Sequence, residues 1–381
     1  MCSVSFAPPC LRGKPSCTMP PYLDDGPSPR TTTELLGHES AERAFLDAWS
    51  SGRLAHAWLI CGPRGIGKAT LAYRIARFVL AGGGEGGGGL FGGPPDSLAI
   101  GPDHPVFRRV ASGGHADFKV VERAWTDDKK TKLKTEIAVD DVRGVGAFLS
   151  LTPGEGGWRV VIVDAADEMN RSSANAILKV LEEPPRNALM LLVSHSPGRL
   201  LPTIRSRCRR VSLTPLPEAS VVELLSRHRP DVPAADAQAI ARLAEGSIGK
   251  ALALAGLGGL DLYREMVGLL SGLPRLDVPA LHAFGDKVAR GDDSFRTLSE
   301  LFAWWVARAA AVAGRCGADK GEVMAGEAAL QRRLVDTAGL DRWVEVWEKI
   351  TRLFERADAV NLDRKQIVLN AFLALERLCR P

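Results

Sequence analysis

The sequence Ala57-Trp58-Leu59-Ile60-Cys61-Gly62-Pro63-Arg64-Gly65-Ile66-Gly67-Lys68 joins an apolar segment directly to a glycine-rich loop. Residues 71–80 follow with apolar side chains at helical spacing, so the stretch predicts a strand, a loop and a helix in that order. The loop has the G-x-x-x-x-G-K spacing of a phosphate-binding loop, or P-loop, in which backbone N–H groups and the lysine surround phosphates. An ordinary glycine turn between a strand and a helix is the alternative interpretation. The candidate nucleotide-binding residues are Gly62, Gly65, Gly67 and Lys68.

Two groups that P-loop enzymes use with Mg²⁺ are missing. The residue after the lysine should be Ser or Thr, whose hydroxyl binds Mg²⁺, but it is Ala69. Thr70 joins the candidate set, although it lies about 100° further round the helix and is poorly placed to replace that ligand. Asp164, a further candidate, ends an apolar segment where an acidic residue would hold Mg²⁺ through water, and the Glu expected next to it is Ala165. We expect ATP or ADP binding without hydrolysis, weak or absent Mg²⁺, and no metal site.

Two further groups of charged residues have two interpretations each. Asp167 and Glu168 follow the same apolar segment and would either act as acidic catalysts or cap and solvate the next helix. Arg207, in Ser206-Arg207-Cys208, stands in a cluster of arginines. It is either part of a solvated basic loop or an arginine finger, a guanidinium offered to the γ-phosphate bound by a neighbouring subunit.

Apolar segments alternate with helical patterns as far as residue 216, which predicts a parallel sheet, and beyond it the patterns are helical. Residues 118–121 and 136–139 are expected to form a hairpin with a lysine-rich tip, and 175–182 a helix stopped by two prolines. The expected segments are a disordered leader over 1–30, an α/β domain over 31–214 with a Gly- and Pro-rich insertion at 82–105, a small helical domain over 215–270 and a second helical domain over 271–381. Met19 is an alternative start of the chain.

Composition narrows the class of protein. A length of 381 residues predicts two or three domains, and 45% hydrophobic residues with a mean hydropathy of -0.02 indicate ordinary globular cores without a membrane span. The net charge of +4 is too small to indicate nucleic-acid binding by itself. Seven cysteines without a C-x-x-C pair predict reduced thiols in the cytoplasm and no zinc site. Cys61 and Cys208 are expected to be packing residues rather than reactive thiols.

Four motifs occur in a shared order: Leu36-Gly37-His38, the P-loop, Asn175-Ala176-Ile177-Leu178-Lys179-Val180-Leu181-Glu182-Glu183-Pro184-Pro185, and Ser206-Arg207-Cys208. In this order they resemble the delta-prime family of bacterial DNA polymerase III clamp-loader subunits, relatives of tau/gamma. The resemblance covers most of residues 31–381. It implies an AAA+ α/β P-loop domain with a parallel sheet, then a small helical lid and an all-helical collar, in a ring with delta and tau/gamma subunits that loads the sliding clamp on primer-template DNA.

The resemblance also assigns roles to single residues. It makes Arg207 a catalytic finger acting in trans on the ATP of a tau/gamma neighbour, and it places Ser194 near the sensor-1 position. A lid arginine of the motor subunits reads the γ-phosphate, and Gly249 occupies its position here. Ala69, Ala165 and Gly249 therefore remove three groups that hydrolysis uses, while the candidate finger is present.

We expect a delta-prime-like subunit of the polymerase holoenzyme that is itself neither a polymerase nor an active ATPase. Two alternatives remain open. One is an active AAA+ ATPase, either a tau/gamma-type motor or a DNA remodeller. The other is a sequence-independent DNA-binding module, which would need the Lys and Arg clusters, including the tip at 129–134, to share one face.

Overall fold

The computed structural model describes residues 27–84, 95–126, 133–155, 157–314, 321–360 and 362–380. They form two compact units: Gly26–Val221 with Gly246–Gly249, and Val222–Glu245 with the residues from Lys250 onward. Residues 1–26 of the expected leader and 85–94 of the expected insertion lie outside the described residues.

The first unit is built on a five-stranded parallel sheet. Its strand order is β2-β3-β4-β1-β5, so β1 is paired on both edges, with β4 and with β5. In this register Cys61, the last residue of β1, lies opposite Ser194 of β4 and Ser212 of β5. The strands are β1 (Ala57–Cys61), β2 (Phe118–Glu122), β3 (Arg159–Asp164), β4 (Ala188–Ser194) and β5 (Arg209–Ser212).

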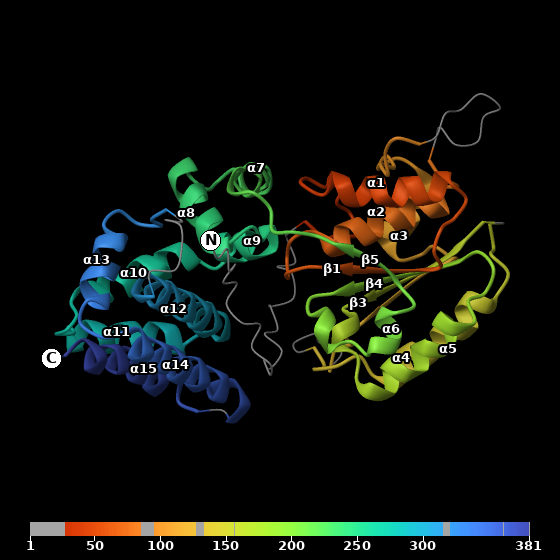
Figure 1. Ribbon diagram of the computed structural model, residues 1–381. Coiled ribbons are helices and arrows are strands. Elements are labelled where there is room, and N and C mark those ends of the chain that lie inside the picture. The colour runs from red at the N-terminus through yellow and green to blue at the C-terminus, as the bar shows by residue number, and fades with distance from the viewer. Residues whose placement is uncertain are drawn as a thin grey trace, which may run out of the picture. The chain divides into compact units, whose positions relative to one another are not determined.

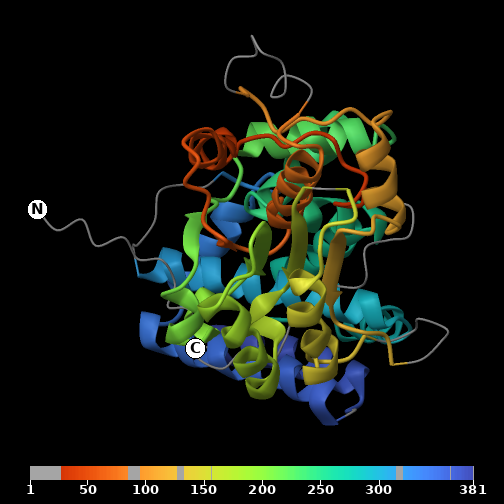
Figure 2. The ribbon, with the colours of Figure 1, turned by 90° about the vertical axis from the view of Figure 1, so that its right-hand side faces the viewer.

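Helices cover both faces of this sheet, as Figure 1 shows for α1 to α3 on one side and α4 to α6 on the other. The view in Figure 2 shows the same three layers, with the red and orange helices above the strands and the yellow-green helices below. The helices are α1 (Glu39–Ser50), α2 (Lys68–Leu80), α3 (Pro105–Ser112), α4 (Val139–Ser150), α5 (Arg171–Glu182) and the single turn α6 (Pro202–Arg205).

Alternate residues of each strand supply the two cores, as the pleat of a strand requires. On the α1–α3 side, Trp58 and Ile60 pack with Phe45 and Phe78, and the Phe45 and Trp58 ring centroids are 5.0 Å apart. On the α4–α6 side, Leu59 and Cys61 join a second apolar cluster. Because both faces are buried, the central strands read as continuous apolar runs.

The predicted pairing of residues 118–121 with residues 136–139 is wrong, although an antiparallel bridge joins Trp125 and Leu133 between these two segments. Residues 118–121 do form a strand, but β2 pairs in parallel with β3, and within 136–139 Ile137 forms a single parallel bridge to Met169. Of the expected lysine tip at 129–134, residues 129–132 lie outside the described residues. The helix expected over 175–182 begins four residues earlier, because the Asn170 side chain accepts a hydrogen bond from the Ser173 backbone N–H and caps it.

The second unit is helical. Its long helices α12 and α14 pack together, and α15 packs against α11 and α14. Phe302 joins these helices, with ring centroids 4.9 Å from Phe372 and 6.0 Å from Phe354. Here α7 and α9 start within the first unit and continue into the second. The helices are α7 (Glu218–His228), α8 (Ala234–Ala244), α9 (Ile248–Gly256), α10 (Gly259–Ser271), α11 (Val278–Ala289), α12 (Asp292–Ala313), α13 (Glu327–Val335), α14 (Leu340–Val360) and α15 (Arg364–Cys379).

The predicted α/β class is confirmed: a parallel five-stranded sheet with a loop of P-loop spacing after β1 is followed by helices. The division of the helical part into a lid over 215–270 and a collar over 271–381 stays a prediction. Within the described ranges, every helix is too short or too polar to cross a bilayer.

We expect Phe78→Ala to lower the free energy of unfolding by about 3–5 kcal/mol, because it leaves a cavity beside Phe45 in a fully buried core. Denaturant unfolding followed by circular dichroism measures the loss. Leu151→Ala, at a residue with 60% exposure, is the control and should change the value little. Equal losses in the two variants would contradict this account of the core.

Candidate functional site

The P-loop connects the end of β1 to the start of α2. Gly65 and Gly67 have φ angles of +77° and +105°, in the left-handed region that glycine adopts without strain, and Gly67 is the N-cap of α2. Because α2 begins at Lys68, the loop lies at a helix N-terminus, whose free N–H groups and partial positive charge suit an anion. The structure therefore brings Gly62, Gly65, Gly67 and Lys68 together as the sequence predicts.

Lys68 and Asp164 interact in a largely dehydrated environment. The Lys68 side chain is buried and its Nζ donates a hydrogen bond to the Pro63 carbonyl. Burial lowers the pKa of Lys68 to about 8, against the opposing effect of the Asp164 and Asp167 carboxylates. Burial likewise raises the pKa of Asp164 to about 6, with Lys68 opposing the shift. The two predicted site residues are thus near enough to influence each other's charge.

The two acidic residues after β3 are occupied by the fold. The Glu168 carboxylate pairs with Arg64 of the P-loop and, at 2.8 Å, with Arg123, which follows β2. The Asp167 Oδ1 accepts a hydrogen bond of 2.8 Å from the backbone N–H of His195, which follows β4. These contacts tie three strand ends to the P-loop, and they favour the structural interpretation of both residues over a catalytic one.

The Mg²⁺-binding chemistry is incomplete at the predicted positions. Ala69 provides a methyl group where a hydroxyl would be needed, and Ala165 is buried in the protein core. Thr70 lies on the first turn of α2 and is half-buried. Among the described residues, no cluster of three or more His, Cys, Asp or Glu side chains could hold a metal ion. The residues present fit a phosphate group better than they fit a phosphate with its magnesium ion.

The segment Gly246–Gly249 sits directly on the P-loop, a contact that the sequence did not predict. The Ser247 hydroxyl donates to the Arg64 carbonyl and the Gly249 N–H donates to the Gly65 carbonyl, each at 2.9 Å. A Cβ atom at Gly249 would lie 3.0 Å from the Gly65 Cα. The backbones meet because both residues are glycines. In this arrangement residue 249 therefore cannot carry a longer side chain unless the loop shifts.

These contacts occupy carbonyl groups of the loop and leave its phosphate-binding chemistry in place. P-loops bind phosphates through backbone N–H groups, whereas Ser247 and Gly249 bond to the Arg64 and Gly65 carbonyls. The Lys68 ammonium, by contrast, would have to leave the Pro63 carbonyl to reach a phosphate.

Two polar side chains at the carboxyl end of β4 have a buried atom without a hydrogen-bond partner among the described residues. The Ser194 Oγ and the His195 Nδ1 are buried and make no hydrogen bond within the described part of the chain. Burial, together with the positive charges of Lys68, Arg64 and Arg123, lowers the pKa of His195 to about 2 and keeps the ring neutral. Ser194 was anticipated from the resemblance. His195 was missed, since a histidine after a strand carries no distinctive spacing.

Arg207 lies on the α5–α6 side of the sheet, where it bonds within its own chain. One guanidinium nitrogen donates to the Thr203 carbonyl at 2.9 Å, and the other forms a 2.9 Å ion pair with Glu182 at the end of α5. About a third of the side chain is exposed. Among the contacts of the described residues, none joins Arg207 to the P-loop, so the structure does not bring it to the nucleotide site of its own chain.

The two thiols near the site are held protonated. Burial raises the pKa of Cys61, and it raises the pKa of Cys208 to about 12. A protonated, buried thiol is a poor nucleophile, which supports the packing role expected for both residues.

The first unit is thus an α/β P-loop domain. Residues 37–217 match the model of the family described as "DNA polymerase III, delta subunit". The chain is 38% identical over 223 residues to DNA polymerase III subunit delta' of Pseudomonas aeruginosa, covering 58% of this chain and 61% of the relative. The chain is 34% identical over 207 residues to subunit delta' of Escherichia coli, covering 54% of this chain and 56% of the relative. It is 30% identical over 231 residues to subunit tau of Escherichia coli, covering 59% of this chain and 32% of the relative.

The chain spans between 32% and 61% of the length of these relatives, so part of each relative has no counterpart in the match. A solved structure of a DNA polymerase III gamma subunit-related protein from Thermotoga maritima is 18% identical, with a TM-score of 0.45, and covers 88% of this chain and 100% of its own.

We expect stability to fall as the pH rises from about 4 to 6, because the folded protein holds the Asp164 proton more tightly than the unfolded chain does. Asp164→Asn should remove this contribution, on the order of 1 kcal/mol after allowance for solvent screening. The free energy of unfolding at pH 4.5 and 6.5 measures it, with Asp103→Asn, at an exposed carboxylate, as control. Parallel pH profiles of wild type and Asp164→Asn would contradict the expectation.

Gly249→Ala should lower the free energy of unfolding by about 1–3 kcal/mol, because its Cβ would press on the Gly65 backbone. Gly268→Ala is the matched control, since nothing lies within 4 Å of a Cβ there and alanine favours a helix. Hydrogen exchange at the Gly249 amide should rise as well. A Gly249 variant as stable as the Gly268 variant would show that the contact with the P-loop is loose.

Proposed function

We propose that the chain is a delta-prime-like subunit of a DNA polymerase III clamp loader, which helps to load a sliding clamp on primed DNA in the cytoplasm. The delta' relatives named above support this role. The partners we propose are tau/gamma and delta subunits, with the clamp and primer-template DNA contacted through the complex. In this assembly residues 31–214 form the AAA+ α/β domain, 215–270 the lid and 271–381 the collar.

One observation carries the proposal that the subunit does not hydrolyse ATP: the P-loop retains its glycines and lysine while Ala69, Ala165 and Gly249 replace three groups used in hydrolysis. The packing of Gly249 on Gly65 supports it, because this approach excludes an arginine side chain from the lid position. Hydrolysis in this class depends on a metal-bound phosphate and a polarised water, and the side chains for both are lacking.

We further propose that ATP or ADP binds here passively. The residues that would hold it are Gly62, Gly65, Gly67, Lys68, Thr70 and Asp164. The P-loop N–H groups and Lys68 would bind the phosphates, with little contribution from Mg²⁺. Opening of the Lys68 contact with Pro63 would accompany binding. A nucleotide held in this way stabilises the subunit without being consumed.

The catalytic contribution would come from Arg207, acting on the ATP of a neighbouring tau/gamma subunit. The Arg207 side chain is partly exposed, and none of its described contacts is with its own P-loop. Both observations support a role across an interface. The ion pair with Glu182 limits the orientations of the guanidinium before any neighbour arrives. A positioned guanidinium stabilises charge that develops on the transferred phosphoryl group.

In a reconstituted clamp loader with primed DNA and clamp, we expect Arg207→Ala to reduce steady-state ATP hydrolysis by roughly tenfold or more. Arg205→Ala, at an exposed arginine in the same cluster, should leave it nearly unchanged. Size-exclusion chromatography establishes that both variant complexes assemble.

Two outcomes would support other interpretations. Unchanged turnover in an assembled Arg207→Ala complex would remove the finger assignment. Substantial turnover by the purified subunit alone would favour an active ATPase, either a tau/gamma-type motor or a DNA remodeller. Steeply salt-dependent DNA binding by the isolated chain would instead favour a DNA-binding module.

A further inference from the structure

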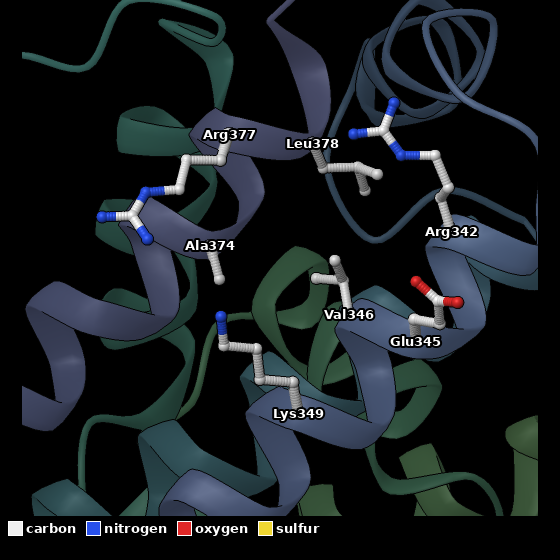
Figure 3. Close-up of a pocket in the computed structure, with 7 residues that line it drawn as sticks. All are labelled: Arg342, Glu345, Val346, Lys349, Ala374, Arg377 and Leu378. Carbon is white, nitrogen blue, oxygen red and sulfur yellow. The ribbon is translucent and has the colours of Figure 1, made fainter.

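In the helical unit, α14 and α15 leave a groove between them on the surface (Figure 3). Three cationic side chains surround it: Arg342 and Lys349 from α14 and Arg377 from α15. Its floor is apolar and consists of Val346, Ala374 and Leu378. The carboxylate of Glu345 lines it as well, so three positive charges and one negative charge surround the floor, and we call these seven residues the α14–α15 groove.

The cations of the groove are not neutralised by their own chain. In the part of the chain that the structure describes, Arg342, Lys349 and Arg377 form no ion pair, although Glu348–Arg352 and Glu376–Arg380 do so at 2.8 and 3.1 Å on the same helices. Figure 3 shows the Lys349 ammonium turned toward Ala374 and away from the Glu345 carboxylate. A Glu and a Lys four residues apart on a helix would ordinarily pair, so this lysine is directed into the groove instead.

The helix dipole favours the position of only one of the three cations. Arg377 lies in the last turn of α15, where the helix dipole favours a cation. Arg342 lies in the first turn of α14, where the dipole disfavours one, and Lys349 lies in the middle of that helix. An anionic partner in the groove would relieve the mutual repulsion of these charges.

The size and polarity of the groove indicate the kind of anion. Its volume of about 160 Å³ is smaller than the roughly 300–1,000 Å³ of sites for small organic ligands and cofactors. It therefore suits a single apolar side chain on the floor, with carboxylates reaching the cations at the rim. A nucleic-acid backbone fits less well, because its phosphates carry no apolar group that could cover Val346, Ala374 and Leu378.

We propose that the α14–α15 groove binds an acidic segment of a partner protein, with one apolar side chain seated on the floor and its carboxylates paired with Arg342, Lys349 and Arg377. The proposal does not rest on the nucleotide site or on the arginine finger. Charge complementarity would set the rate and the selectivity of this contact, and the apolar anchor would add affinity.

The test uses the full chain and a fluorescein-labelled 16-residue peptide in which Asp and Glu alternate with Leu, followed by fluorescence anisotropy. The groove variant combines Arg342→Glu, Lys349→Glu and Arg377→Glu. The matched control combines Arg275→Glu, Arg290→Glu and Arg332→Glu, three exposed arginines of the same unit outside the groove. Two further peptides replace every Leu by Ser or every acidic residue by Lys, and a 20-nucleotide oligothymidine represents nucleic acid.

We expect the acidic Leu peptide to bind wild type and the control variant alike, and to bind the groove variant about tenfold more weakly or worse. The Ser peptide should bind about fivefold more weakly than the Leu peptide, and the Lys peptide should not bind. Equal binding to wild type and groove variant would overturn the proposal. Loss of oligothymidine binding in the groove variant, without any peptide binding, would replace it by a nucleic-acid contact.

Circular dichroism and the unfolding midpoint establish whether the groove variant is folded. If it is not, Lys349→Gln alone provides the measurement, since it removes one exposed charge and keeps a polar side chain at this position. About threefold weaker peptide binding by this variant, together with a smaller salt dependence, supports the groove. Unchanged affinity counts against it.

Discussion

Pairing of β1 on both of its edges is the constraint on which the first unit depends. Hydrogen bonds to β4 on one side and to the edge strand β5 on the other fix β1 between these two strands, and Cys61 is its last residue. The chain must then leave the sheet at Gly62 and enter α2 at Lys68, which fixes the position of the P-loop. The carboxyl ends of β3 and β4 meet the loop at the same edge, as parallel strands require.

Several charged side chains lie at that edge of the sheet, where water has little access, and they pair with one another. Glu168 neutralises Arg64 and Arg123, while Lys68 and Asp164 shift each other's pKa. Removing one partner of such a pair leaves the other charge buried without a partner, which lowers the free energy of unfolding. These pairs hold the side chains around the P-loop in place, whereas Lys68 would have to leave the Pro63 carbonyl to reach a phosphate.

Sequence patterns predicted the features that depend on neighbours in the chain. The P-loop, the apolar strands ending at Asp164 and Ser194, and the helix stopped by two prolines all have local signals, and each is present. The missed features depend on distant partners. Ser247 and Arg64 are 183 residues apart, and the pairing of β2 with β3 rather than with a hairpin partner is set by the sheet as a whole.

The α14–α15 groove could not be predicted from the sequence either, because its residues come from two helices and belong to no motif. A sequence pattern also does not show that Arg207 pairs with Glu182, since Glu182 ends α5 and Arg207 follows α6. In each case the side chain was identifiable but its partner was not.

The contact between Gly65 and Gly249 has a consequence for the side chains that position 249 can carry. An arginine restored at 249 would strike the loop backbone before it could read a phosphate, and it would gain nothing while Ala69 and Ala165 remained. The close approach of two backbones therefore restricts position 249 to small residues, whatever side chains stand at positions 69 and 165.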